Sequence, residues 1–292
     1  MAAQAQGGPQ AQGGRAGGGA AAAAQEASPA PEGGRGGRGG RGGGRGPAGP
    51  PAGPTPRLPN DPYLGVNAGK PDLGGNTQSI NAGGARGIWR VPYIVDMQKQ
   101  GRNVDGSPIK PEDVPFTAKG KAAFDLAQGN NSKDDPEGFC LPPGVPRMMY
   151  TPYPAEVFQL PNRIVFIFEG GAHVWRNIWL DGRKHDPNFN PSYLGDSIGH
   201  WEGDTLVVDT VGFNDRTWLD AAGHGHGEQL HVIEKFSRPD SNTLRLEATI
   251  EDPEYYTKPW TVVTTSTWFP NAEIIEYICQ ENNRDTQHLV GK

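Results

Sequence analysis

Three histidines lie close together in the stretch AAGHGHGEQLHVIEKF, residues 221–236, at positions His224, His226 and His231. Imidazole nitrogens bind transition metals and exchange protons near neutral pH, so this spacing is compatible with a metal site. Glycines flank the first two histidines and favour a loop, and a flexible loop makes a poorly preorganised set of ligands. We expect a mobile polar loop around His224 and His226. A catalytic lid and a metal site of His224, His226 and His231 are the alternatives.

His231 differs from the other two because it begins a predicted strand, LHVIEKFSR, which fixes the direction of its side chain. Other predicted strands offer Asp209, in TLVVDTV, and His200, in SIGHW, as partners. An imidazole beside a carboxylate suits general acid/base chemistry. The sequence therefore supports a catalytic group of His231 with Asp209 or His200. The alternative is a hydrogen-bonded core histidine without a chemical role.

Glu234 interrupts the apolar face that Val232 and Phe236 share on the same predicted strand. A carboxylate in that position needs a partner or a water-filled cavity, because burying an unpaired charge is costly. Glu234 is therefore a candidate ligand-binding residue.

Arg176, in VWRNIW, is a second charge inside an apolar segment. We expect its guanidinium to pair with Glu169 across the turn EGGAH. Alternatively both residues are candidate ligand-binding residues, with Arg176 binding the carboxylate of an anionic ligand. Trp175 and Trp201 would line a pocket for an apolar or sugar ring, although barrels also use tryptophan simply for packing.

The elements that must position these residues are strands. From residue 150 onward apolar and polar residues alternate with a period of two, and turn residues recur about every ten positions. Nine segments fit this pattern: AEVFQLP, RIVFIFEG, HVWRNIWLDG, DSIGHWEG, TLVVDTVGF, LHVIEKFSR, TLRLEATIED, WTVVTTSTWF and EIIEYICQE. We expect an antiparallel, calycin-like up-and-down barrel of eight to ten strands, because closure removes exposed edges. A two-sheet β-sandwich is the alternative.

The rest of the chain divides by composition. Residues 1–57 are rich in Gly, Arg and Pro and have almost no large apolar side chains, so we expect a disordered tail. Residues 58–149 read as an extended arm packed on the body, with one short helix at 117–128 that Thr117 caps and Gly129 ends. The barrel is expected over 150–285, followed by a short tail at 286–292.

The charge balance limits the partners. Six arginines and two glutamates give residues 1–57 a charge of about +4 (6 − 2), so the remainder of this −6 chain carries about −10. RGG runs are typical of RNA-binding tails, but this tail lacks aromatic residues for stacking on bases. An acidic body also repels phosphate, so we expect no nucleic-acid partner.

Several function classes lack their motifs. The sequence has no stretch of about 18 apolar residues that could insert into a membrane as a helix. It has no Gly-x-Ser-x-Gly, P-loop or His-Glu-x-x-His motif, and we expect no cofactor. The start MAAQAQGG lacks the charged and apolar regions of a signal peptide, but it resembles the first residues of a mature chain after a small-residue cleavage site.

The chain has two cysteines, Cys140 and Cys279. An even number permits a disulfide, and two buried thiols are the alternative. A disulfide would require an oxidising compartment.

Five blocks resemble landmarks of a family of largely exported bacterial proteins of unknown function. These are CLPPGVPRMM (140–149), SIGHWEGDTLVVDTVGFND (197–215), LHVIEKFSR (230–238), TKPWTV (257–262) and EYICQENNRD (276–285). The resemblance covers about residues 140–285. It implies export to the periplasm or beyond, favours a bridge between Cys140 and Cys279, and implies no catalytic residues.

Together these features predict an exported barrel that binds a small, partly apolar molecule in its lumen. One alternative is a cofactor-independent hydrolase, hydratase or isomerase that uses His231 with Asp209 or His200. The other is an envelope scaffold whose lumen is filled.

Overall fold

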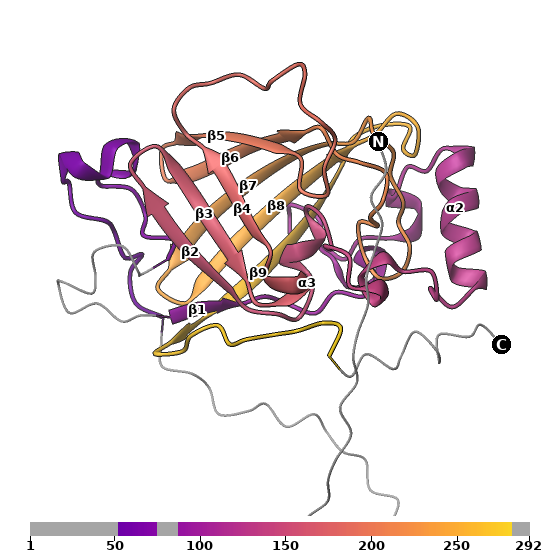
Figure 1. The fold of residues 1–292 in the computed structure, drawn as a ribbon, viewed down its shortest axis with the longest axis horizontal. Helices are drawn as coiled ribbons and strands as arrows, with labels where there is room; N and C mark the ends of the chain where they lie inside the picture. The colour runs from indigo at the N-terminus through magenta and orange to yellow at the C-terminus, as the bar shows by residue number, and fades with distance from the viewer. Residues whose placement is uncertain (1–51, 75–86, 282–292) are drawn as a thin grey trace, which may run out of the picture. The chain divides into compact units, whose positions relative to one another are not determined.

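Nine strands form a closed barrel in which each strand pairs with the next along the chain and the ninth pairs with the first (Figure 1). The structure is a computed structural model, and it describes residues 52–74 and 87–281. The strands are β1 (Gly87–Arg90), β2 (Ala155–Leu160), β3 (Arg163–Phe168), β4 (Trp175–Trp179), β5 (Asp196–Glu202), β6 (Thr205–Val211), β7 (His231–Asp240), β8 (Thr243–Glu251) and β9 (Trp260–Pro270). The closed, mainly β barrel predicted from the sequence is confirmed.

Short helices lie before β1, between β1 and β2, and between β3 and β4. They are η1 (Pro62–Asn67), α1 (Met97–Gln100), η2 (Pro111–Asp113), α2 (Ala118–Gly129), η3 (Pro136–Phe139), η4 (Arg147–Met149) and α3 (Gly170–His173), where η marks a 3-10 helix. The helix predicted at 117–128 is confirmed as α2. Thr117 is its N-cap, and the Thr117 hydroxyl accepts a hydrogen bond from the Gly120 N–H at 3.0 Å.

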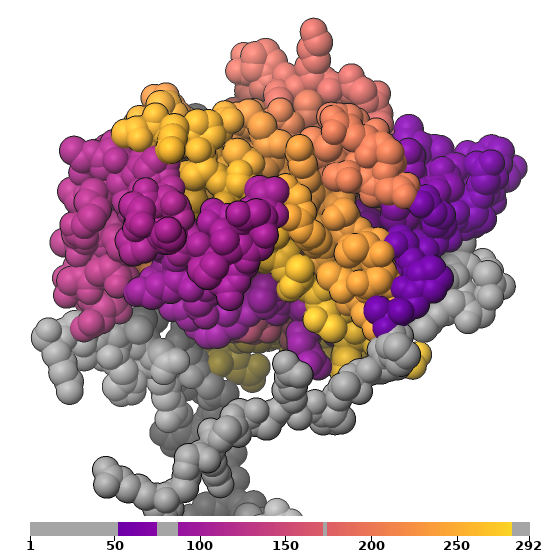
Figure 2. Space-filling model, turned by 180° about the vertical axis from the view of Figure 1, so that it is seen from behind, coloured from indigo at the N-terminus to yellow at the C-terminus, as the bar shows by residue number. Residues whose placement is uncertain are grey.

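The part of the arm from α1 to α2 packs on the outside of the barrel beside β8 and β9, as the view from behind shows (Figure 2). Antiparallel bridges join Arg102 to Val263 and Phe116 to Tyr256. These backbone contacts hold the segment between α1 and α2 against the barrel wall.

The ninth strand comes from a different part of the chain than the pattern predicted. β1, within the arm, pairs antiparallel with β9 from Gly87↔Pro270 to Arg90↔Thr267. The predicted strand at 273–281 is irregular instead, with Ile275 67% exposed. The physical reason is that β1 already occupies the second edge of β9, so no edge remains for another strand.

One seam departs from the antiparallel meander. β4 and β5 run parallel and share a single residue pair, Trp179↔Ile198. A parallel pair cannot be joined by a tight turn, so the chain returns through the long segment 180–195. β1 and β2 also share a single residue pair, and these two seams have the least backbone pairing in the barrel.

A buried guanidinium crosses that seam inside the barrel. Arg176 of β4 donates from Nε to the Ser197 hydroxyl of β5 at 3.0 Å, and from Nη2 to the Thr210 hydroxyl of β6 at 2.9 Å. The same Nη2 pairs with the carboxylate of Glu234 on β7, and the two charged side chains are 3% and 0% exposed. One side chain therefore joins four consecutive strands. The expected pairing of Arg176 with Glu169 is not formed.

The interior of the barrel is filled by its own side chains. Alternate residues of the strands point inward, as the burial of β3 and β8 shows, so the period-two pattern is confirmed. Ten of these inward side chains are no more than 1% exposed: Val157, Ile164, Phe166, Ile178, Leu206, Val208, Phe236, Leu246, Ala248 and Val262. The lumen therefore holds a packed core, which differs from the open pocket that the sequence suggested.

The predicted tail at 1–57 lies mostly outside the described residues, as does the segment 286–292. The end of that tail is nevertheless bound to the barrel. Thr55 donates a hydrogen bond to the Arg238 carbonyl at 2.8 Å, and Arg57 forms an ion pair with Asp204 in the β5–β6 turn. The boundary of any tail therefore precedes residue 57.

We expect Glu234→Gln to lower the free energy of unfolding by about 3 kcal/mol, because it leaves the Arg176 charge buried without its counterion. Urea denaturation would measure this. Glu228→Gln, at an exposed carboxylate, is the matched control and should change stability by less than about 0.5 kcal/mol. Equal stabilities of the two variants would contradict the importance of this ion pair.

Candidate functional site

The segment that precedes β2 builds one wall of a cavity at the end of the barrel. Asp135 caps η3, because its side chain accepts a hydrogen bond from the Glu137 N–H at 3.1 Å and Pro136 starts the turn. Arg147 begins η4 among the buried residues Val145 and Met148, which draws its side chain inward.

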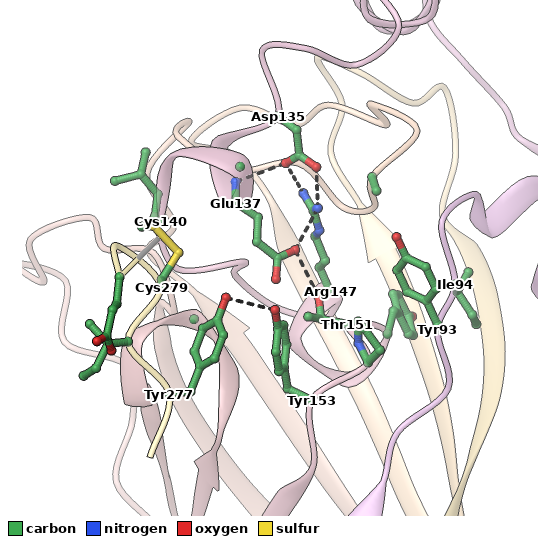
Figure 3. A pocket seen from close by; sticks show the side chains of 18 residues that line it. Tyr93, Ile94, Asp135, Glu137, Cys140, Arg147, Thr151, Tyr153, Tyr277 and Cys279 are labelled. Carbon is green, nitrogen blue, oxygen red and sulfur yellow. Dashed lines mark hydrogen bonds and ion pairs between the residues drawn. A yellow bond between two sulfur atoms is a disulfide. The ribbon is translucent and has the colours of Figure 1, made fainter. Parts of the chain in front are cut away.

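Arg147 is held by two carboxylates. Its Nη1 and Nη2 donate to the two oxygens of Asp135 at 2.7 and 2.6 Å, and Nη2 lies 2.8 Å from Oε2 of Glu137 (Figure 3). The Arg147 side chain is only 4% exposed, so both ends of this bidentate pair are sheltered from water. Thr151 adds a hydrogen bond from its hydroxyl to Oε2 of Glu137 at 3.2 Å.

These residues line a cavity of about 510 Å³, which we call the end cavity. It lies at the barrel end where β1 stops and β2 starts. Its wall combines acidic, aromatic and aliphatic side chains with the disulfide between Cys140 and Cys279. The lining residues include Tyr93, Asp135, Glu137, Leu141, Arg147, Tyr150, Thr151, Tyr153, Tyr277 and Glu281.

Two polar atoms on this wall are buried without a partner. They are Oε1 of Glu137 and the hydroxyl oxygen of Tyr150. Four other such atoms occur among the described residues, and none of those belongs to a residue that lines the end cavity. Most buried polar atoms in proteins are hydrogen-bonded, so a pair of unsatisfied atoms on one cavity wall requires an explanation.

Burial shifts the titration of both groups. It raises the pKa of Glu137 even though Arg147 acts in the opposite direction. Burial also raises the pKa of Tyr150, to which the negative charges of Glu234 and Asp220 contribute further. The Tyr150 hydroxyl therefore keeps its proton and is available as a hydrogen-bond donor.

The disulfide confirms the predicted pairing of Cys140 with Cys279, 139 residues apart in the chain. It ties the irregular segment 273–281 to the loop before η4. Tyr277 on that segment accepts a hydrogen bond from the Tyr153 hydroxyl at 2.9 Å, and the two rings lie 4.7 Å apart. The cross-link thus brings the C-terminal segment into the cavity wall.

The predicted pair of His231 and Asp209 does form, but on the outer face of the barrel. Nε2 of His231 lies 2.9 Å from Oδ1 of Asp209, and Nδ1 lies 3.1 Å from Oε2 of Glu251. His231 alternates with the buried Val232 along β7, which turns it away from the lumen. His200 does not join this pair, since it is 64% exposed and contacts Glu202 at 3.1 Å.

A second histidine, His185 from the segment 180–195, extends this group. Its Nε2 lies 3.1 Å from the same Oδ1 of Asp209, and its Nδ1 lies 3.0 Å from Oδ2 of Asp196. Each imidazole therefore lies between two carboxylates. A neutral imidazole has one N–H and donates to only one of them. The arrangement fastens the long β4–β5 connection to the wall and places histidines at a solvent-facing surface.

The structure buries the loop that was expected to be mobile. His224 and His226 are 0% and 2% exposed. The Asp220 carboxylate accepts hydrogen bonds from the Met97 N–H at 2.7 Å and from the His224 N–H at 3.2 Å, and it contacts Nδ1 of His224 at 2.8 Å. His226 contacts the Thr217 hydroxyl through Nε2 at 2.7 Å. The aspartate thus organises backbone that glycine spacing alone suggested was flexible.

The three histidines of that stretch do not share a site, because His231 lies on the outer wall. Among the described residues, one group of three potential metal ligands has its ligand atoms within 4.8 Å of one another, namely Asp96, Asp220 and His224. Both carboxylates already accept backbone N–H groups: Asp96 from Gln98 at 3.0 Å, and Asp220 from Met97 at 2.7 Å. These contacts fit a structural polar cluster that joins α1 to the loop.

The remaining candidate residues lie apart from one another. Glu169 accepts a hydrogen bond from the Ile275 N–H at 2.9 Å, and Trp175 faces outward with 64% exposure. Trp201 donates from its indole N–H to the Asn67 side chain at 2.9 Å. These three residues do not gather around one pocket, in contrast to the expectation.

Comparison of the chain with protein-family models, with curated proteins and with solved structures found no match. The resemblance to a family of exported proteins therefore remains a prediction from the five sequence blocks. Among the described residues, no helix is both long and apolar enough to cross a membrane.

Asp135, Glu137, Arg147 and Tyr150 were not predicted from the sequence. One signal was present, since Arg147 stands in PGVPRMMY among apolar residues and prolines, as Arg176 does in its own segment. A buried arginine needs nearby carboxylates, and DDPEGF supplies them ten residues earlier. The strand periodicity could not place this irregular segment at the barrel end.

We expect the free energy of unfolding to fall in two stages on acidification. Burial lowers the pKa of His226, so below about pH 6.5 the unfolded chain binds a proton that the folded chain does not. Burial alone would raise the pKa of Asp220, but His224 and the N–H donors outweigh it and lower that pKa. The contribution of Asp220 is therefore lost as pH falls below about 3.9.

Urea denaturation across this pH range would show both stages. His200→Asn, at an exposed histidine, should leave the first stage unchanged, whereas His226→Gln should flatten it. A first stage that persists unchanged in His226→Gln would assign it to another group.

Proposed function

We propose that this protein binds a small, partly apolar molecule in the end cavity and not in the filled lumen of the barrel. The observation that carries the proposal is the pair of unsatisfied buried atoms, Oε1 of Glu137 and the Tyr150 hydroxyl, on one cavity wall. Leaving a buried polar atom without a partner costs about 1–3 kcal/mol. A ligand with polar groups would supply the missing partners.

The size and lining of the cavity support the same proposal. Small-molecule sites usually enclose about 300–1,000 Å³ and combine apolar walls with a few convergent polar groups. The end cavity has about 510 Å³, with tyrosine rings and Leu141 beside the Arg147 carboxylate cluster.

The cavity wall is also preorganised. The disulfide fixes Cys140 relative to Cys279. The bidentate pair of Arg147 with Asp135 joins the two ends of the segment 135–147. A rigid wall loses little conformational entropy when a ligand binds, which favours affinity.

The enzymatic alternative would use His231 and Asp209, whose side chains are 29% and 45% exposed. Catalytic acid/base groups benefit from a site that excludes water, and these residues stand on the outer face of the barrel. The end cavity, with its unsatisfied polar atoms, therefore favours binding as the function.

We further propose that the protein acts in an oxidising compartment outside the bacterial cytoplasm. The disulfide between Cys140 and Cys279 supports this, because such bonds persist where the surroundings are oxidising. The resemblance to an exported family agrees with this location.

A fragment screen by ligand-observed NMR, followed by titration, would test binding. We expect Leu141→Trp to fill the end cavity and weaken the best fragments by at least about tenfold. Leu126→Trp is the matched control, since Leu126 is 66% exposed on α2, and it should leave affinity unchanged. Fragments that bind both variants equally would place binding elsewhere and overturn the proposal.

Breaking the disulfide tests how far it supports the cavity. We expect Cys140→Ser with Cys279→Ser to lower stability by roughly 5 kcal/mol or less, because the bond closes a loop of 139 residues. Urea denaturation of the wild type with and without reductant would give the same difference. Thiol titration of the unreduced, denatured protein should find no free cysteine. Two free thiols would refute the bond.

A further inference from the structure

We propose that the ligand of the end cavity is an organic cation, an ammonium group carried on an apolar or aromatic body. This inference rests on the proposed function and specifies the chemical class of ligand that the same cavity selects.

The balance of charge on the cavity wall favours a cation. Three carboxylates line the end cavity, from Asp135, Glu137 and Glu281, against the single guanidinium of Arg147. The ionised wall therefore carries a charge of −2 (1 − 3). A cleft lined mainly by one sign of charge attracts cations when that charge is negative, and it repels anions.

Arg147 is not available to an anionic ligand. Both of its terminal nitrogens already bind Asp135, and one also binds Glu137. With 4% of its side chain exposed, the guanidinium offers little surface to a ligand in the cavity. An anionic ligand would have to displace one of these carboxylates and leave it unpaired.

One carboxylate oxygen of Glu137 remains free to accept a hydrogen bond. Oε2 accepts hydrogen bonds from Arg147 and Thr151, while Oε1 has no partner. An ammonium group has three N–H donors and no acceptor, so it complements this oxygen. The Tyr150 hydroxyl oxygen is a second acceptor on the same wall.

The cavity also presents an aromatic surface. The rings of Tyr153 and Tyr277 lie 4.7 Å apart, tilted by 46°, and their hydroxyls are hydrogen-bonded, so two adjacent rings line the cavity. Figure 3 shows the Glu137 carboxyl between this pair and Arg147, with Tyr93 on the opposite side. A cation over a tyrosine ring gains about 0.5–2 kcal/mol, more when it is desolvated.

The cavity would therefore couple binding to a proton. Burial raises the pKa of Glu137 in the empty site, and a bound cation favours the charged carboxylate instead. Protons and the cation compete for Glu137, so affinity should weaken as pH falls.

Three probes with one aromatic body test the charge preference: benzylamine, benzyl alcohol and benzoate. Titration by NMR should show benzylamine bound at least about tenfold more tightly than benzoate. The affinity of benzylamine should weaken progressively as the pH is lowered from about 8, although the probe stays charged throughout, because protons compete with it for the Glu137 carboxylate. The affinity of benzyl alcohol should depend little on pH.

Variants locate the effect. Glu137→Gln should weaken the affinity for benzylamine by about tenfold and remove the pH dependence of that affinity. It should leave the affinity for benzyl alcohol unchanged, and Glu228→Gln should change none of these quantities. Melting temperatures of both variants report whether they fold. If Glu137→Gln does not fold, the pH dependence of the wild type still decides between the outcomes.

The outcomes separate the two proposals. Benzoate that binds as tightly as benzylamine, and is displaced by Leu141→Trp, would overturn the cation preference but keep the cavity as a binding site. An affinity for benzylamine that changes neither with Leu141→Trp nor with pH would overturn the inference. Failure of all three probes would also overturn it, while the fragment screen would judge the cavity independently.

Discussion

The barrel depends on a charged side chain that crosses one of its two weakly paired seams. β4 and β5 share one residue pair, so backbone hydrogen bonds alone hold this side poorly. Arg176 compensates by reaching from β4 to Ser197, Thr210 and Glu234 on the next three strands. Burying this ion pair is costly in itself, but its geometry specifies which strands are neighbours where the ladder does not. The packed interior is a consequence, because closure brings apolar side chains from all sides together.

On the outer face of the barrel, histidines and carboxylates stabilise the same region. The connection between β4 and β5 is long because the strands run parallel, and His185 anchors it to Asp196 and Asp209. Arg176, Glu234 and Asp209 are charged residues within apolar strands, and all three stabilise the parallel β4–β5 seam or its connection. Two polar atoms without hydrogen-bond partners, Oε1 of Glu137 and the Tyr150 hydroxyl, lie together at the barrel end.

Strand periodicity predicted much of the architecture, including eight of the nine strands and α2 with its Thr117 cap. It failed where tertiary context decides. GIWR, in a loop-like arm, became β1 because β9 offered it an edge, and 273–281 lost its pairing for the same reason. His231 and Asp209 were correctly paired, but alternation alone does not say which face of a strand is inside. Asp135, Glu137 and Arg147 lie on or beside 3-10 turns, which carry no comparable periodic signal.

The position of β1 also has a consequence for biosynthesis. A ribosome releases residues 87–90 early, yet their main partner, β9, emerges only after β8. Until then the nascent sheet has two unpaired edge strands, and both expose free N–H and C=O groups that could pair with other chains. Cys279 emerges later still, so closure of the barrel and formation of the disulfide both wait for residues that follow β8. Pairing between segments so far apart in the sequence is slow. The barrel can therefore close only after β9 has been synthesised.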